Sequence, residues 1–151
     1  MTRDPAVTSR IMASVRNRDT GPELALRREL HRRGLRYRLR SNLLGRPDIV
    51  FPGARVAVFV DGDYWHGNTW RVRGAESFDS YFAALANGDF WREKITRNID
   101  RDRNVNQSLT TAGWRVIRIW ESDLQHDLPS CADRVQSRVQ SSRQSNAVAE
   151  R

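Results

Sequence analysis

Residues 45–66 read GRPDIVFPGARVAVFVDGDYWH, and this stretch decides the fold. Two β-branched and aromatic runs, PDIVF and RVAVFV, flank the turn sequence Pro-Gly-Ala, which predicts a β-hairpin. In such an antiparallel pair we expect Asp48 and Asp61 at the same end, within about one residue of opposition. Burying an unpaired carboxylate is costly, so two of them at the end of a core hairpin need solvent or a cation.

A metal site is one interpretation of this acidic pair. Mg²⁺ is bound in proteins through one or two carboxylates together with water and substrate phosphate. The alternative is that each aspartate only belongs to a turn, because Asp48 follows Pro47 and Asp61 precedes Gly62. Since the hairpin aligns the two side chains, we favour the metal site.

A helix and a strand are expected before the hairpin. TGPELALRRELHRRG predicts a helix with Thr20 as N-cap, Glu23 completing a capping box and Gly34 at its end. LRYRLRSNLL alternates apolar residues with arginines, which predicts a half-buried strand over residues 35–44.

Beyond the hairpin, residues 67–88 predict a loop with one short helix. FWREKITRNIDRDRNVNQSLTTAG predicts a long helix that ends at Gly113, and WRVIRIW predicts a strand. Residues 125–151 are rich in Ser, Gln and Arg, which predicts a polar C-terminal tail with a short helix through Leu128–Val139 that then frays. The element order indicates an α/β fold with a mixed sheet.

Two further side chains are candidates for chemistry. Asp102 lies three residues after Ile99 on the apolar stripe of the long helix, so it is expected to face the sheet, either near a metal or paired with an arginine. His66 follows the hairpin and titrates in the range useful for catalysis, although a lone histidine is more often structural.

Composition points to a polyanionic partner. The 151 residues suit one domain, the formal net charge is +8, and every basic residue except Lys94 is an arginine. Coding bias explains arginine over lysine but not the excess of positive charge, so nucleic acid is the expected partner. Residues 1–18 form a basic arm that includes Arg16 and Arg18.

Other classes of protein are disfavoured. Cys131 is the single cysteine, which excludes an internal disulfide and a cysteine-rich zinc site. No apolar stretch is long enough to cross a bilayer, and the first residues lack the features of a secretory signal, so a cytoplasmic location without membrane association is expected.

Five segments together resemble the very short patch repair (Vsr) endonucleases: SRIMASVRNRDTGPE, GRPDIVF, VFVDGDYWHG, FWREKITRNIDRDR and GWRVIRIWE. The resemblance spans about Ser9 to Glu121 and implies a Vsr-like endonuclease domain over residues 19–124. It implies the restriction-endonuclease-like fold, PD-(D/E)XK, in which helices flank a mixed sheet. It further implies Mg²⁺-dependent nicking of double-stranded DNA at T·G mismatches, with Mn²⁺ as a substitute and other repair proteins as possible partners.

The resemblance also implies roles for single residues. Asp48 matches the metal-binding aspartate, Val60 falls where a main-chain carbonyl binds the metal, and Asp61 replaces a histidine that acts through metal-bound water. His66 matches the residue that activates water, and Asp102 matches a carboxylate in the outer shell of the metal. Glu23 matches a catalytic glutamate, although a capping box explains this residue equally well. The expected DNA contacts are Tyr64, Trp65, Trp91, Arg16, Arg18, Arg46 and Lys94.

One departure from the family pattern concerns zinc. The positions of the family's structural zinc ligands are here Asp63, Asn68, Trp70 and Ser122, so no structural zinc is expected and packing of Trp70 is one way to hold the loop. Two alternatives to mismatch repair stay open. The chain could be a restriction or defence nuclease that cuts matched or modified DNA, or a catalytically silent DNA-binding module.

Overall fold

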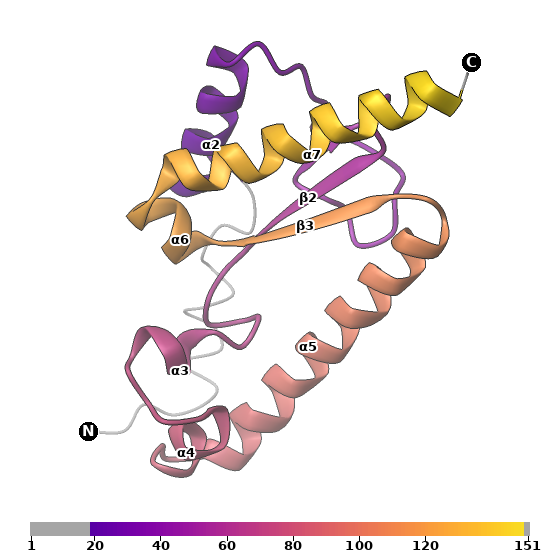
Figure 1. The fold of residues 1–151 in the computed structure, drawn as a ribbon. Coiled ribbons are helices and arrows are strands. Elements are labelled where there is room, and N and C mark those ends of the chain that lie inside the picture. Colours follow the sequence, from indigo (N-terminus) through magenta and orange to yellow (C-terminus); the bar gives the residue numbers. More distant parts are fainter. Residues whose placement is uncertain (1–18, 150–151) are drawn as a thin grey trace.

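The computed structural model describes residues 19–149, in which three strands form a sheet with helices on both faces (Figure 1). The elements are α2 (Gly21–Arg32), β1 (Ile49–Phe51), β2 (Val56–Asp61), α3 (Thr69–Val72), α4 (Phe78–Ala83), α5 (Gly88–Thr111), β3 (Arg115–Trp120), α6 (Glu121–His126) and α7 (Leu128–Ala149). The arm predicted for residues 1–18, with Arg16 and Arg18, lies outside the described part. Within residues 19–149, no helix combines the length and apolar character needed to span a membrane.

The predicted hairpin forms, and the sheet is mixed. β1 pairs antiparallel with β2, and β3 pairs with β2 in parallel on the other side. Ile49 lies opposite Val58, so continuing the register puts Asp48 opposite Phe59, two positions before Asp61. The offset is one residue larger than predicted. An offset of two keeps both carboxylates on one face of the sheet as diagonal neighbours.

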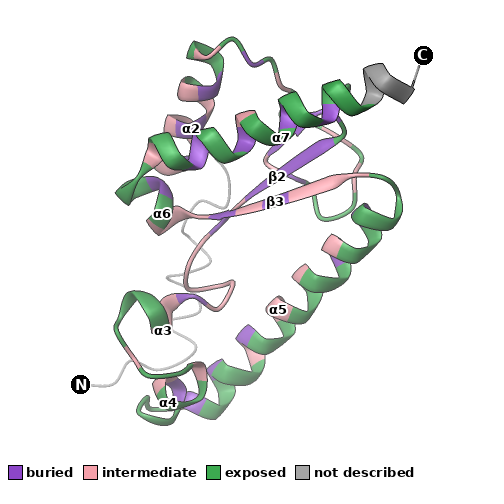
Figure 2. Cartoon of the chain, viewed as in Figure 1, coloured by how far each residue is buried: buried purple, intermediate pink, exposed green. Residues whose placement is uncertain are grey.

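Alternation along β2 divides the core between the two faces of the sheet. Val56 and Val58 join a buried cluster with residues of α2, α6 and α7, whereas Ala57 and Phe59 pack on Val105 and Leu109 of α5. Figure 1 shows α7 and α5 on opposite sides of the sheet, and Figure 2 shows β2 as the buried centre. The same alternation brings Asp61 to the face that α5 covers.

The two helices with the strongest patterns form as predicted. The Thr20 hydroxyl accepts the Glu23 amide at the start of α2, and Leu30 on its inner face is fully buried. α5 ends just before Gly113, whose φ of 92° belongs to the left-handed region that favours glycine.

The prediction of a strand over residues 35–44 is wrong. This segment makes a single bridge, in which Arg38 and Val50 exchange backbone hydrogen bonds of 2.8 Å. β1 is only three residues long, and the left-handed backbone at Gly45 and Arg46 turns the chain away from the sheet. Residues 67–88 hold two short helices, α3 and α4, where one was predicted; Ser77 and Ser80 form a capping box at α4.

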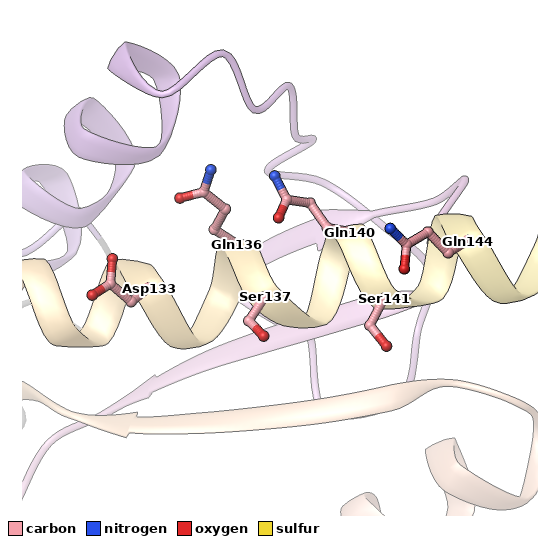
Figure 3. A pocket seen from close by; sticks show the side chains of 6 residues that line it. All are labelled: Asp133, Gln136, Ser137, Gln140, Ser141 and Gln144. Carbon is pink, nitrogen blue, oxygen red and sulfur yellow. The ribbon is translucent and has the colours of Figure 1, made fainter.

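The C-terminal helix is longer than predicted and belongs to the main core. α7 continues past Val139 to Ala149. Its first half packs on the core through a narrow buried stripe within the Ser- and Gln-rich sequence, formed by Cys131, Ala132, Val135 and Val139. Its outer face is polar, with the side chains of Asp133, Gln136, Ser137, Gln140, Ser141 and Gln144 in rows along the helix (Figure 3). Arg33 bonds Asp133 and Gln136 and so ties α2 to this helix.

A hydrogen-bonded clip holds the loop between β2 and α3. The Asp63 carboxylate accepts hydrogen bonds from Asn68 Nδ2 (2.7 Å), from Ser122 Oγ (2.5 Å) and from the Ser122 amide (3.0 Å). These are three of the four positions at which the resemblance implies zinc ligands. At the fourth, Trp70 carries the Arg71 guanidinium 4.5 Å from its ring centroid. The clip therefore fixes the loop to the start of α6 through hydrogen bonds.

Asp63→Ala should lower the free energy of unfolding by about 2 kcal/mol, because it leaves three part-buried donors without their acceptor. Thermal unfolding followed by circular dichroism measures this change. Asp123→Ala, on the exposed side of α6, is the matched control and should unfold like the wild type.

The purified wild-type protein should carry no stoichiometric zinc, because the loop is held by hydrogen bonds at the positions expected for zinc ligands. Elemental analysis measures this content. An Asp63→Ala protein as stable as the wild type, or a wild-type protein that carries one zinc ion per chain, would contradict this account of the loop.

Candidate active site

Three of the four sequence-predicted acidic residues, Asp48, Asp61 and Asp102, gather in one cleft at the end of the hairpin. The cleft has a volume of about 430 Å³ and lies between the β2 end of the sheet and α5. Its lining includes Asp48, Val60, Asp61, His66, Asp102 and Arg118. Asp48, Val60 and Asp61 come from the paired strands of the hairpin and its start. His66 lies in the loop after β2, Asp102 on α5 and Arg118 on β3.

Asp48 is fixed across the two strands of the hairpin. Its amide donates to the Val58 carbonyl at 2.9 Å, and its Oδ2 accepts the Val60 amide at 2.7 Å. The carboxylate thus replaces a ladder partner where β1 has not yet begun, and it lies beside the main chain of Val60. This is the pair that the resemblance implies as metal ligands.

His66 is held by the carboxylate of α5. Its Nδ1 lies 2.5 Å from Asp102 Oδ2 and 3.8 Å from Asp61 Oδ1. A carboxylate only accepts, so Nδ1 carries the proton in this bond and Nε2 of the neutral ring keeps its lone pair. Such an imidazole can take a proton from water. The prediction that Asp102 faces the sheet is confirmed, and its partners are His66 and Arg118.

Close packing on α5 sets this geometry. Gly67 has a φ of +87°, and a Cβ there would lie 2.6 Å from the Ile99 side chain. A Cβ at Gly45, in the loop before β1, would lie equally close to the Val105 side chain. Both loops therefore approach the helix closely only because these two positions are glycine.

Arg118 is a residue of the cleft that the sequence interpretation missed. Its Nη1 donates to both oxygens of Asp61, at 3.0 and 3.1 Å, and lies 3.5 Å from Asp102 Oδ1. Asp61 is only 4% exposed, and this burial raises the pKa of its carboxyl against the opposing charges of His66 and Arg118. The signal in the sequence was the second of two arginines in the strand WRVIRIW, which stands between two isoleucines.

Several charges act on His66 at once. Burial alone lowers the pKa of the imidazole, but the hydrogen bond to Asp102 and the charge of Asp61 hold that pKa above its ordinary value of 6.5. The charge of Arg118 on β3 lowers the pKa of His66, and Glu121 of α6 lies close enough to interact with His66 electrostatically. The proton affinity of the ring thus depends on carboxylates from three elements.

A metal ion is compatible with these donors. One ligand atom from each of Asp61, His66 and Asp102 lies within 4.8 Å of the others, and Asp48 and Val60 line the same cleft. Carboxylate and carbonyl oxygens are the ligands that hard divalent cations prefer. The site can therefore hold a metal ion. The carboxylate of Asp61 would then bind both the ion and Arg118.

Glu23 is not brought into this group. It is 1% exposed, it bonds Arg27 Nη2 at 2.5 Å, and its Oε2 accepts the Asp19 amide at 2.9 Å. The carboxylate is occupied at the start of α2, but it accepts the amide of Asp19 instead of the amide of Thr20, so only the Thr20 half of the predicted capping box is present. The structure gives this glutamate structural partners and no contact with the cleft residues.

The aromatic residues proposed to contact DNA form one cluster beside the cleft. Tyr64 packs edge-on against Trp65 and Trp91, with centroids 5.3 and 5.9 Å apart. The Lys94 ammonium lies 5.1 Å from the Trp65 ring and 5.4 Å from the Trp91 ring. Burial raises the pKa of Tyr64 to about 12, so its hydroxyl stays neutral.

Arg46 is exposed at the opposite rim of the cleft. The backbone φ of Arg46 is 51°, which is unusual for a residue other than glycine. Arg46 lines the cleft, and together with Arg40 it also lines an adjoining hollow. A cation in this position can reach a phosphate next to the acidic residues. Of the predicted DNA contacts, Tyr64, Trp65, Trp91, Lys94 and Arg46 thus lie around one site.

Comparison with known proteins gives a consistent set of relatives. The profile of the family described as DNA mismatch endonuclease Vsr matches residues 2–72. The type II nicking enzyme V.NmeDIP of Neisseria meningitidis serogroup C is 40% identical over 136 residues, which cover 89% of this chain and 87% of that protein. The type II nicking enzyme V.NaeI of Lentzea aerocolonigenes is 43% identical over 121 residues, covering 76% and 68% respectively.

The DNA mismatch endonuclease Vsr of Escherichia coli is also similar, with 34% identity over 122 residues that cover 80% of this chain and 73% of that protein. These similarities extend over most of the described elements, and the family profile includes the positions of Asp48, Asp61 and His66. The chain therefore belongs to the Vsr family of DNA endonucleases.

Proposed function

We propose that this endonuclease uses Mg²⁺ to nick one strand of double-stranded DNA at a T·G mismatch, as a step of very-short-patch repair. The observation that carries the proposal is the meeting of Asp48, Asp61, Asp102 and His66 in one cleft beside exposed cations. The printed name of the Escherichia coli relative, DNA mismatch endonuclease, supports the choice of substrate. A DNA substrate favours a cytoplasmic location.

The proposal includes the fold family. Helices flank a mixed sheet whose central hairpin ends in acidic residues, which is the arrangement expected for restriction-endonuclease-like nucleases of the PD-(D/E)XK group. In this chain Asp48 stands at the PD position, and Asp61 at the end of the next strand.

Asp48, the Val60 carbonyl and Asp61 would hold the metal ion. Their oxygen atoms suit Mg²⁺, and Mn²⁺ has similar preferences. When bound, such an ion polarises a phosphate and stabilises the charge that develops on its oxygens.

The protein residues supply proton transfer and position. His66 Nε2 accepts a proton from water as the water oxygen forms a bond to phosphorus and one bridging P–O bond breaks. Asp102 holds Nδ1 and stabilises the imidazolium that results. Tyr64 and Trp65, which are partly buried, would contact bases at the mismatch. Trp91 is only 5% exposed and packs against both of them, so the DNA contact predicted for it becomes a supporting role. Arg46 and Lys94 would contact the backbone, with Arg16 and Arg18 adding charge from the arm.

A second candidate function is nicking linked to a restriction system, on matched or modified DNA. It is favoured by the relatives from Neisseria and Lentzea, whose printed names are type II nicking enzymes. A silent DNA-binding module is disfavoured, because the relatives are named as enzymes and the His66–Asp102 pair is intact.

A panel of labelled duplexes distinguishes these functions. Duplexes that are fully matched, that carry one T·G mismatch or that contain 5-methylcytosine are incubated with the protein and Mg²⁺, and the products are resolved on denaturing gels. We expect one strand of the mismatched duplex alone to be cut. Cutting of the matched or modified duplexes would replace mismatch repair with the second candidate function.

Asp48→Asn should reduce the single-turnover cleavage rate by roughly two to three orders of magnitude, because the charge that would hold the metal is lost. The amide oxygen can still accept the Val60 amide, so the unfolding temperature should change little. Asp100→Asn, exposed on α5, is the matched control. Cleavage by Asp48→Asn at the wild-type rate would remove Asp48 from the metal site.

The cleavage rate should rise with pH through a midpoint above 6.5, because the neutral form of His66 is the base and its pKa is raised. Asp102→Asn removes a charge and a hydrogen bond that favour the protonated ring, so the midpoint should move to lower pH. Single-turnover rates and NMR titration of the His66 ring measure both effects, with His31 and His126 as internal references. An unchanged midpoint would contradict the role given to Asp102.

A further inference from the structure

Arg118 is held more rigidly than a surface arginine. Its Nε donates to Asn106 Oδ1 of α5 at 2.7 Å, while Nη1 donates to both oxygens of Asp61. The guanidinium carbon lies 4.1 Å from the centroid of the Phe59 ring. Contacts from α5 and from two positions of β2 thus fix the plane of the guanidinium, and the side chain is 18% exposed.

The guanidinium keeps donors for a ligand. Arginine has five N–H groups, of which two are on Nη2. Within residues 19–149, the side-chain hydrogen bonds of Arg118 engage Nε and Nη1, and Nη2 is not among the buried side-chain atoms without a hydrogen-bond partner. Arg118 lines the cleft together with Asp48 and Val60, and it also lines a neighbouring hollow with Asn106, so its guanidinium stands at the border of the two.

Asp61 and Arg118 form a fixed ion pair. Asp61 is almost completely buried, and a buried carboxylate without a partner is strongly destabilising. Both oxygens of Asp61 accept hydrogen bonds from Nη1 of Arg118, so this ion pair does not use the two N–H groups on Nη2. A preorganised guanidinium matches the oxygens of a phosphate and stabilises negative charge that develops on them.

We propose that Arg118 contacts the phosphodiester that is cut, by donating from Nη2 to a non-bridging oxygen, and that Asp61 is a positioning residue that holds this guanidinium in place. The inference rests on the proposed nuclease function and adds a substrate contact to it. It also gives Asp61 a purpose besides that of a metal ligand.

The first test compares Arg118→Gln with the wild type on a duplex that the wild type cuts. We expect the single-turnover rate at saturating DNA to fall by about 100-fold, because one preorganised donor to the reacting phosphate is lost. Affinity for the uncut duplex in EDTA, measured by fluorescence anisotropy, should stay within about threefold, since many other cations bind the backbone. Arg115→Gln, on the same strand and without contact to Asp61, is the matched control for loss of a positive charge.

A double variant separates a phosphate contact from a structural role. Arg118→Gln leaves Asp61 buried without its cation, which alone can lower stability. Arg118→Gln with Asp61→Asn removes both charges, so its unfolding temperature should recover towards the wild-type value. Asp61 is also a proposed metal ligand, so the cleavage rate of the double variant is compared with that of Asp61→Asn alone. If Arg118 contacts the phosphate, the double variant cuts more slowly than Asp61→Asn although both proteins are stable.

Cleavage by the double variant at the rate of Asp61→Asn alone would overturn the inference, because Arg118 would then act only by neutralising Asp61. Cleavage by Arg118→Gln at the wild-type rate would overturn it as well. Failure of the proposed function looks different: wild-type protein would then cut no duplex of the panel, and both proposals would fall.

Discussion

The hydrogen bond between His66 and Asp102 joins two parts of the chain that the sheet alone would leave apart. It exists because the loop after β2 lies directly on α5, with Gly67 against Ile99 where a larger residue would not fit. The Asp63 clip restrains the same loop from the other side, through Ser122 at the start of α6. The site thus depends on how closely one loop can approach one helix.

Charge balance is the second condition that the site meets. Asp61 and Asp102 lie within reach of one ring nitrogen, and two carboxylates so close repel each other unless cations lie between them. Arg118 supplies this positive charge from β3, and the N–H group of His66 adds a hydrogen bond to Asp102 from the loop. Local positive charge allows an acidic cleft to exist in the protein before any ion or DNA arrives.

Local patterns predicted the elements that local physics determines. The hairpin follows from β-branched runs around a turn, α2 from its cap at Thr20, and the orientation of Asp102 from the apolar stripe of α5. The contacts of Arg118 and the Asp63 clip join segments distant in sequence, which no periodicity encodes. The stripe of Cys131, Val135 and Val139 recurs every four residues, but the many Ser and Gln residues of α7 obscured it. The predicted strand over residues 35–44 failed because alternation cannot create a pairing partner.

The outer edge of β3 has a consequence for how the protein behaves at high concentration. Within the described residues β3 pairs only with β2, so its other side offers backbone groups to which a strand of another molecule could add. Arg134 of α7 donates to the Arg118 carbonyl on this strand, and the strand itself carries Arg115. Cationic side chains along an open sheet edge disfavour the addition of a strand from another molecule.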